Sequence, residues 1–251
     1  MPFAHLKRLI VNADDFGFTR DTNEGIVFGH SHGILTSTTL MATGAAFDHA
    51  VTLARENPSL DVGVHLVLVG AEGYPSTVAR LTAAVTLGHI PIYERLKSQI
   101  TKILDAGIRP THLDTHKHTH LLPPILDAVA RISEEFRVPW VRQPLPAPIP
   151  FLRPLLQRLL QQHGCRTTDH FAGFEITGRY DARMLAALIR RLPDGLTEFM
   201  CHPGFCGDEL RAARTRLKDS RQVELDALVS AEVREALRQS AVTLISYRDL
   251  A

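Results

Sequence analysis

Cysteine, net charge and long apolar runs are all scarce in this sequence. Its 251 residues include only Cys165, Cys201 and Cys206, a small, odd number that fits a reducing compartment better than a disulfide framework. No stretch is apolar for long enough to span a bilayer, so no integral membrane segment is expected. The formal charge of +1 gives no reason to expect nucleic acid or an anionic membrane as a partner.

The start of the chain and its composition predict a globular protein. Residues 2–8 lead straight into Leu9-Ile10-Val11, which is too short for the apolar core of a signal peptide, so we expect a cytoplasmic protein. Hydrophobic residues make up 45% and charged residues 22%, values that argue against disordered and fibrous chains. The length suits one domain, residues 1–251, because α/β barrels of this size routinely form single domains. A homodimer is the default assembly because two-fold homo-oligomers are common.

Short apolar runs alternate with longer amphipathic segments along most of the chain. Strands between helices indicate βαβ units and a mostly parallel α/β sheet, because parallel neighbours need a crossover connection. A (β/α) barrel and an open doubly wound sheet both fit, and the number of repeats favours a distorted, TIM-like (β/α) barrel. The proline-rich residues 143–154 are expected to form a rigid exposed loop, and residues 69–91 an irregular insertion. The expected strands are 9–13, 37–42, 62–68, 111–115, 140–142, 198–200 and 242–246, and the expected helices are 23–31, 46–56, 93–106, 123–136, 151–162 and 181–191.

Two adjacent carboxylates, Asp14 and Asp15, stand where the first apolar strand gives way to a glycine-containing turn. In parallel α/β folds this end of the strands carries the active site. Neighbouring ionised carboxylates repel each other unless a cation or an arginine compensates, so the pair costs stability unless it has a function. The alternative is that both only cap the following helix, although Thr22 or Asp21 is better placed for that role.

Imidazoles are concentrated in residues 111–120. His112, Asp114, His116, His118 and His120 all have even numbers, so on an extended strand they would share one face. Such a face is a poor core but a suitable wall for a metal-containing site, in which a carboxylate fixes the tautomer of a ligating ring. For any one of these histidines, a hydrogen-bonded structural role is the alternative.

His65 is the only polar residue inside the apolar strand predicted at 62–68. Taken alone, it would be interpreted as a core histidine with a satisfied hydrogen bond. Its predicted neighbours change that interpretation, because Asp15, His65 and His116 each lie near the carboxyl end of a separate parallel strand. One carboxylate and two imidazoles with open positions suit one catalytic divalent ion, either Zn²⁺ or a hard ion such as Mg²⁺ with bound water.

His202 follows the strand predicted at 198–200, in a turn that also contains Cys201 and Cys206. There it would be useful as a proton donor to a leaving group. Two competing interpretations involve the cysteines. One is a structural zinc site of Cys165, Cys201, His202 and Cys206, for which the Cys-x4-Cys spacing is unusual. The other is a nucleophilic Cys201, although nothing in the sequence indicates a lowered thiol pKa.

Together these motifs resemble the YdjC-like carbohydrate deacetylases, which include chitooligosaccharide deacetylase and the hopanoid-associated deacetylases. The resemblance implies a distorted (β/α) barrel and metal-dependent removal of acetyl groups from N-acetylated amino sugars. By position, Asp15, His65 and His116 match the metal ligands of the family. Asp14 matches its catalytic aspartate, and Arg142 resembles the arginine that orients this aspartate in related polysaccharide deacetylases. The motifs span nearly the whole chain, at residues 9–17, 23–26, 35–41, 63–66, 111–116 and 201–204.

One departure from the family bears on the substrate. Many relatives have three consecutive histidines where this chain has His116-Lys117-His118, and Lys117 is expected to point away from the imidazole face. A chitooligosaccharide-type substrate is expected, with a glycolipid such as an N-acetylglucosaminyl hopanoid as the alternative. Exposed Phe151 and Leu152 would then meet the lipid. A non-catalytic sugar- or metal-binding module is a third hypothesis, against which the complete set of ligands and base argues.

Overall fold

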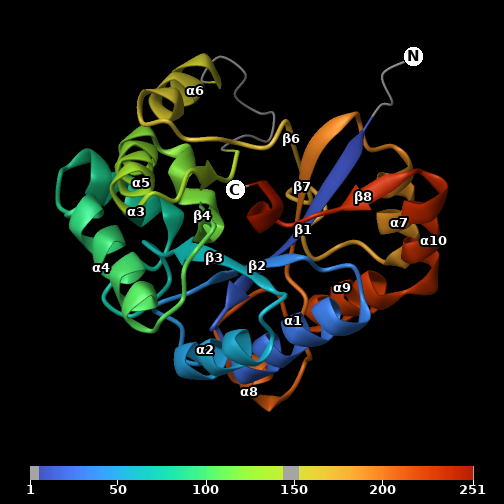
Figure 1. Cartoon of the computed structure of the whole chain (residues 1–251). Helices are drawn as coiled ribbons and strands as arrows, with labels where there is room; N and C mark the ends of the chain where they lie inside the picture. The colour runs from blue at the N-terminus through green and yellow to red at the C-terminus, as the bar shows by residue number, and fades with distance from the viewer. Residues whose placement is uncertain (1–5, 144–152, 251) are drawn as a thin grey trace.

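A parallel sheet curled into an incomplete barrel forms the centre of the molecule (Figure 1). The computed structural model describes residues 6–143 and 153–250. Its strands run in the order β5-β4-β3-β2-β1-β7-β6, with β8 paired to the first part of β1 and all pairs parallel. The predicted distorted α/β barrel is thereby confirmed. The strands are β1 (Lys7–Phe16), β2 (Ser37–Leu40), β3 (Asp61–Leu66), β4 (His112–Thr115), β5 (Trp140–Val141), β6 (His170–Ala172), β7 (Gly195–Cys201) and β8 (Val242–Leu244).

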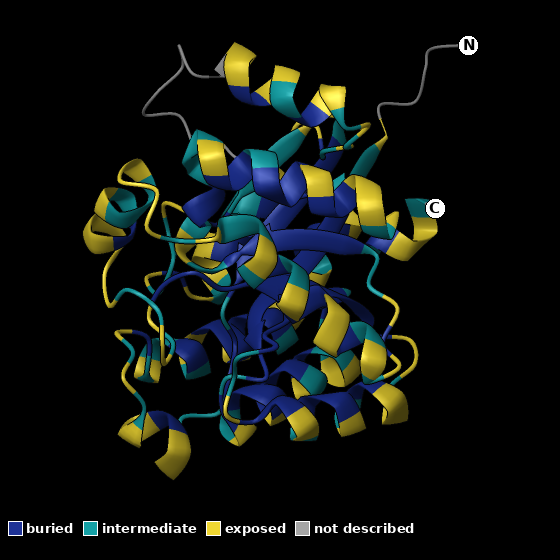
Figure 2. Ribbon diagram, turned by 90° about the vertical axis from the view of Figure 1, so that its left-hand side faces the viewer, coloured by how far each residue is buried: buried dark blue, intermediate teal, exposed yellow. Residues whose placement is uncertain are grey.

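Helices surround the sheet and turn their apolar faces toward it, as the buried centre and exposed outer surfaces in Figure 2 show. No helix in residues 6–143 and 153–250 is both long and apolar enough to cross a membrane. The helices are α1 (Arg20–His32), α2 (Phe47–Glu56), α3 (Val78–Thr86), α4 (Ile92–Asp105), α5 (Pro123–Phe136), α6 (Arg153–Gln162), α7 (Ala182–Arg190), α8 (Asp208–Ala212), α9 (Asp219–Val229) and α10 (Ala231–Gln239), with 3-10 helices η1 (His116–Leu121) and η3 (Tyr247–Leu250).

The secondary structure differs from the sequence prediction mainly in the second half of the chain. Strand β6 and helices α8, α9 and α10 were not predicted, and α3 lies inside the insertion that was expected to be irregular. Helix α9 has no simple apolar stripe because it buries Arg221 and Glu224 beside its leucines. The lipid-facing role expected of Phe151 and Leu152 concerns residues outside the described ranges.

Helix α1 begins with a hydroxyl cap rather than a carboxylate cap. The Thr19 side chain accepts a hydrogen bond from the Thr22 backbone N–H at 3.2 Å. Thr22 or Asp21 was expected to cap this helix, but the cap is Thr19, which lies up to three residues earlier. Neither Asp14 nor Asp15 is needed as a cap.

Strand β1 separates two environments because its side chains alternate. Its odd-numbered residues 9–13 belong to the main apolar core between sheet and helices. On the other face, Ile10 joins a small apolar cluster with Tyr247 from η3. Asn12 and Asp14 follow on that inner face, where Asn12 Oδ1 lies 3.0 Å from His112 Nε2. The inside of the barrel is therefore polar toward its carboxyl end, where the candidate site lies.

Candidate active site

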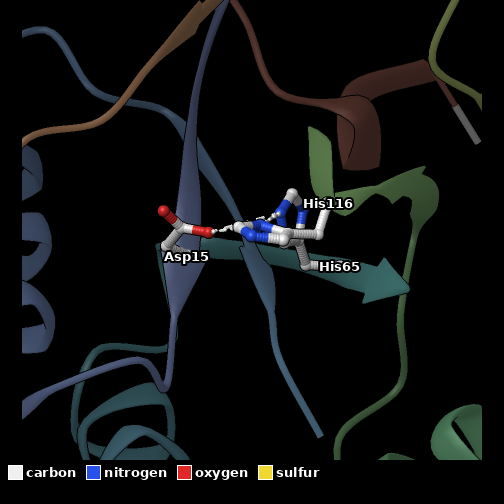
Figure 3. Close-up of side chains that lie close together, drawn as sticks. All are labelled: Asp15, His65 and His116. Atoms are coloured by element: carbon white, nitrogen blue, oxygen red, sulfur yellow. Dashed lines mark hydrogen bonds and ion pairs between the residues drawn. The ribbon is translucent and has the colours of Figure 1, made fainter. Parts of the chain in front are cut away.

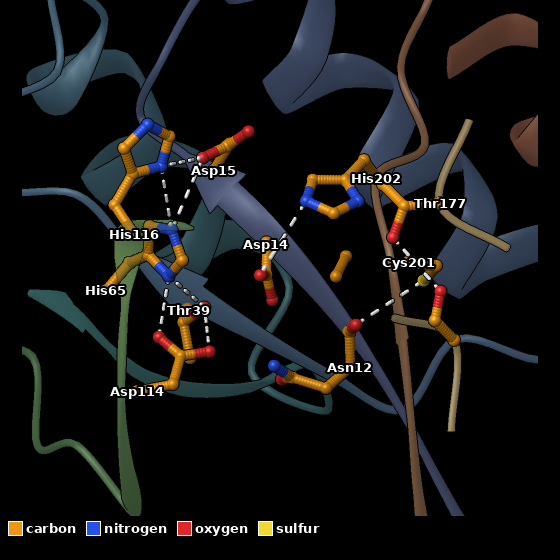
Figure 4. Close-up of polar contacts among 12 residues, drawn as sticks. Asn12, Asp14, Asp15, Thr39, His65, Asp114, His116, Thr177, Cys201 and His202 are labelled. Atoms are coloured by element: carbon orange, nitrogen blue, oxygen red, sulfur yellow. Dashed lines mark hydrogen bonds and ion pairs between the residues drawn. The ribbon is translucent and has the colours of Figure 1, made fainter. Parts of the chain in front are cut away.

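The end of β1 directs its two adjacent carboxylates to different partners. The pairing of β1 with β2 shifts register between Ala13 and Phe16, and Asp15 has a φ of 69°, in the left-handed region. Such a conformation is uncommon for a residue other than glycine and is often found at functional sites. Asp14 consequently stays on the inner face while Asp15 turns toward β3 and η1, as Figure 4 shows. The strand continues to Phe16, past its predicted end at Ala13.

Asp15, His65 and His116 come together at the carboxyl ends of β1, β3 and β4 (Figure 3). Asp15 Oδ1 lies 3.1 Å from His116 Nδ1 and 3.4 Å from His65 Nε2, and the two nitrogens are 3.2 Å apart. Ligands about 2.0–2.1 Å from a tetrahedral Zn²⁺ lie roughly 3.3 Å from one another, so the three donor atoms have the spacing that such an ion requires. The convergence predicted from the strand ends is what the structure contains.

A second group of possible ligands, Asp14, His65 and Asp114, is also compact. Arg142 lies 2.7 Å from an oxygen of each of its two carboxylates. The guanidinium already neutralises these carboxylates and occupies their lone pairs. The first group therefore fits a divalent ion, and the second fits a buried ion-pair network.

Asp114 orients the His65 ring by a hydrogen bond to the ring nitrogen that faces away from Asp15 and His116. Its Oδ1 lies 2.6 Å from His65 Nδ1, and Thr39 donates to Asp114 Oδ2 at 3.1 Å. This arrangement keeps a hydrogen on Nδ1 and directs Nε2 toward Asp15 and His116, as carboxylates that hydrogen-bond to metal-binding histidines commonly do. Burial opposes a charged ring here, but Asp114 and Asp14 outweigh it and raise the pKa of His65 to about 10. Binding of a cation would displace the proton on Nε2.

Asp14 is held by two parallel hydrogen bonds from Arg142. Nη1 donates to Oδ2 at 2.9 Å and Nη2 to Oδ1 at 2.7 Å, while Nε donates to Glu198 at 2.8 Å. Burial would raise the pKa of Asp14, but the charges of Arg142 and His65 lower it below its ordinary value. Asp14 is therefore ionised at neutral pH, with its orientation set by a fully buried arginine.

His202 lies across the opening from the histidine pair, just after β7 (Figure 4). Its Nε2 is 3.8 Å from Asp14 Oδ2, and its backbone N–H donates to Glu224 at 2.6 Å. Burial lowers the pKa of His202 despite the nearby carboxylates of Asp14 and Asp15, so the ring is neutral at rest. Five of the six predicted site residues thus line one cavity, and the sixth, Arg142, contacts it only through its ion pair with Asp14.

The segment after β4 does not continue as a strand, so the shared face expected for the even-numbered residues was wrong beyond Thr115. Lys117 and His118 both have left-handed backbone angles, with φ of 55° and 51°. His118 packs its ring 4.8 Å from Phe174, while His120 folds back to within 2.5 Å of the Thr115 hydroxyl. Lys117 lines the central cavity and does not point away from it.

The cysteines take no part in a metal site within the described ranges, where neither group of candidate ligands contains one. Cys201 Sγ lies 3.4 Å from the Asn12 carbonyl, and burial raises its pKa well above the ordinary value. Cys165 and Cys206 instead contact Ser133 and an aspartate on α9. The described cysteines therefore do not form the expected zinc site, and Cys201 does not line the cavity, which argues against a nucleophilic role.

Arg221 is the main residue of the site that the sequence did not predict. It stands on α9, is 1% exposed, and its Nη2 pairs with Asp15 Oδ2. Burial would raise the pKa of Asp15, but Arg221 and His116 hold it well below its usual range. The two residues are 206 positions apart, and no local pattern distinguishes a buried arginine from a surface one.

These side chains surround a cavity of about 700 Å³ at the carboxyl end of the barrel. Its lining combines apolar and aromatic side chains with arginines from the segment before α9. A volume in this range suits a small-molecule ligand. The walls include Phe18, Met41, Val67, Val69, Lys117, Phe174, Arg214 and Arg216.

Comparisons with known proteins agree across nearly the full length. The model of a family described as "YdjC-like protein" matches residues 8–239. A carbohydrate deacetylase of Brevibacillus brevis is 33% identical, covering 97% of this chain and 99% of its own. A carbohydrate deacetylase of Clostridium beijerinckii is 32% identical, and the match covers 97% of this chain and 100% of that protein. A crystal structure from Enterococcus faecalis V583, provisionally described as a cellobiose-phosphate cleavage protein, has the same fold, with TM-score 0.84, 24% identity and coverage of 98% and 99%.

Proposed function

This chain belongs to the YdjC-like protein family, and on that premise we propose that it is a metal-dependent carbohydrate deacetylase acting on N-acetylated amino sugars. The observation that carries the proposal is the pairing of two groups at one cavity. Asp15, His65 and His116 have the spacing of metal ligands, and Asp14 stands beside them in an arginine clamp. We assign the whole chain to one deacetylase domain, which the match to residues 8–239 supports.

Asp15, His65 and His116 would hold one divalent ion, Zn²⁺ or Mg²⁺. When bound, that ion supplies a Lewis acid that polarises the acetyl carbonyl and lowers the pKa of water. Asp14 then takes the proton of the attacking water, because it is ionised and its carboxylate faces the same cavity. Arg142 keeps the carboxylate in position for this transfer and stabilises its charge.

His202 would return a proton to the departing amine. Its ring is neutral at rest, so it must first receive a proton, and Asp14 Oδ2 at 3.8 Å is the nearest acidic group to supply one. A small movement of either side chain closes this gap to hydrogen-bond distance. The water hydrogen thus ends on the amine, and acetate and a free amino sugar are the products.

The test is acetate release from N-acetylglucosamine oligomers by the purified protein. We expect release with Zn²⁺ or Mg²⁺ present, loss of release on adding a chelator, and recovery when the ion is restored. A protein that retains a tightly bound ion but releases no acetate from any acetylated sugar would instead be a binding module. A chitooligosaccharide is the first substrate to try because its amide is the group that this site suits.

A further inference from the structure

Two arginines are fully buried near the proposed site, and they differ in how their nitrogens are used. All three guanidinium nitrogens of Arg142 have carboxylate partners, namely Asp14, Asp114 and Glu198. Arg221 donates through Nε to the Leu217 carbonyl at 3.3 Å and through Nη2 to Asp15. Its Nη1 is buried and has no hydrogen-bond partner among residues 6–143 and 153–250.

The spare donor belongs to a residue that lines the cavity. Arg221 borders the 700 Å³ space together with Asp14, Asp15 and His202, whereas Arg142 does not. The Phe18 ring, whose centroid lies 5.8 Å from Arg221 Cζ, flanks the guanidinium inside the same cavity. Since Nη2 is fixed on Asp15 and Nε on Leu217, the plane of the guanidinium is set and Nη1 cannot turn away to solvent.

A buried N–H of a charged group is costly to leave unpaired, and the cost is removed when an acceptor oxygen arrives. The ligand that enters this cavity must bring its reacting amide to Asp15, His65 and His116. Nη1 shares its carbon with the nitrogen that binds Asp15, so the acceptor it can reach belongs to the acetyl group or to the atoms next to it. A neutral or anionic oxygen there would accept the hydrogen bond that Arg221 Nη1 otherwise lacks.

We propose that Arg221 is a substrate-binding residue, which fixes Asp15 through Nη2 and donates from Nη1 to an oxygen at the acetyl end of the substrate. The same donor would hold the carboxylate of acetate after hydrolysis. This inference rests on the proposed deacetylase function. It assigns to the site a second arginine whose role is recognition, in contrast to the positioning role of Arg142.

The discriminating variant is Arg221→Lys, which keeps a positive charge beside Asp15 but lacks the planar fork that reaches two acceptors at once. We would measure KM and kcat for N,N′-diacetylchitobiose, inhibition by sodium acetate, and Zn²⁺ content per chain. Loss of one charge-assisted hydrogen bond should raise KM and the acetate inhibition constant roughly 10- to 100-fold, with one Zn²⁺ still bound. Arg20→Gln removes an exposed arginine of α1 and should change none of these values.

A structure of the wild-type protein with acetate bound gives a test that does not depend on a buried variant folding. An acetate oxygen within hydrogen-bond distance of Arg221 Nη1 would support the inference, and acetate bound without that contact would overturn it. An active wild-type enzyme whose Arg221→Lys variant keeps its KM and acetate inhibition would also overturn it. Absence of wild-type acetate release with Zn²⁺ bound would contradict the proposed deacetylase function itself.

Discussion

Asp14 and Asp15 are neighbours in the chain, yet each has its own arginine. Arg142 pairs with Asp14 inside the barrel, and Arg221 pairs with Asp15 at the opening. Each cation lowers the pKa of its carboxylate against the effect of burial, so two adjacent negative charges coexist in a space that would otherwise protonate one of them. Their different surroundings are the reason for assigning them different roles, a base and a ligand.

The proposed base is tested by Asp14→Asn, which preserves shape and one hydrogen bond to Arg142 but cannot accept a proton. Turnover should fall about 10²- to 10⁴-fold, the usual contribution of a general base. Binding of Zn²⁺, measured by competition with a chromogenic chelator, should stay within a few-fold of wild type because Asp15 is untouched. Near-normal turnover by this variant would rule out Asp14 as the base.

The orienting carboxylate of His65 provides a second test at this scale. Asp114→Asn leaves a weaker acceptor at His65 Nδ1, which lies 2.6 Å from Asp114 in the native protein. We expect metal affinity to fall roughly 10- to 100-fold, as for other partners of ligating histidines. The exposed Asp226, whose carboxylate contacts Gln222, supplies the control Asp226→Asn. Equal affinities in the two variants would mean that Asp114 does not support the ion.

Among the elements, α1 and the turn after β7 meet at a contact that permits no side chain. A Cβ on Gly25 would lie 2.5 Å from Gly204 Cα. The turn is further held by Gly204 N donating to the Arg221 carbonyl at 3.2 Å, and by Glu224, which accepts from the His202 N–H. Helix α9 thus holds the turn that carries His202 and also presents Arg221 to Asp15.

Gly25→Ala should therefore displace the turn, because backbone atoms and not a flexible side chain oppose the new methyl group. We expect a loss of about 1–3 kcal/mol in the free energy of unfolding, the range for overpacking, together with a lower kcat. Gly29→Ala on the same helix is the matched control, since its Cβ would meet side chains alone, the nearest being the flexible Leu225 Cδ1 at 3.3 Å. Urea denaturation and acetate release measure both effects. Similar losses in the two variants would indicate a general effect on α1.

At the scale of the whole molecule, the inside of the barrel contains buried histidines that are neutral at rest beside the Arg142 ion-pair network. Burial and the charge of Arg142 lower the pKa of His112 well below its ordinary value, and lower that of His120 to about 3. The unfolded chain takes up these protons near pH 6.5, whereas the folded protein does not. Their contribution to stability is therefore complete above pH 6.5 and is lost as the pH falls, in the case of His120 toward pH 3.

The metal-free protein should accordingly lose stability as the pH falls below about 6.5, where these histidines are protonated in the unfolded chain but not in the folded one. Each such histidine contributes a slope of about 1.4 kcal/mol per pH unit between roughly pH 6 and pH 4. His120→Asn, which keeps a polar group beside Thr115, should reduce the slope by that amount. Urea midpoints at several pH values in the presence of a chelator measure it. A variant slope equal to that of wild type would mean that His120 is protonated in the folded protein.

The sequence alone indicated a parallel α/β barrel and brought Asp14, Asp15, His65 and His116 to one end of it. Those inferences succeed because apolar runs mark strands locally, and parallel strands necessarily place their carboxyl ends at one edge. His202 was placed by the same reasoning, because it follows a predicted strand, and the family resemblance added Arg142. The even spacing of residues 112–120 predicted one shared face, and this prediction fails beyond Thr115 because left-handed backbone angles at Lys117 and His118 end the alternation of side chains.

Only the tertiary structure decided what surrounds those residues. Arg221 approaches Asp15 from 206 positions away, Glu224 on the same helix holds the His202 turn, and Arg142 links three carboxylates from three strands. These contacts depend on how helices and strands pack, which no local pattern encodes, and burial together with neighbouring charges then sets the charge of each titratable group. The sequence determined which side chains could reach the site, and long-range packing determined their partners and protonation.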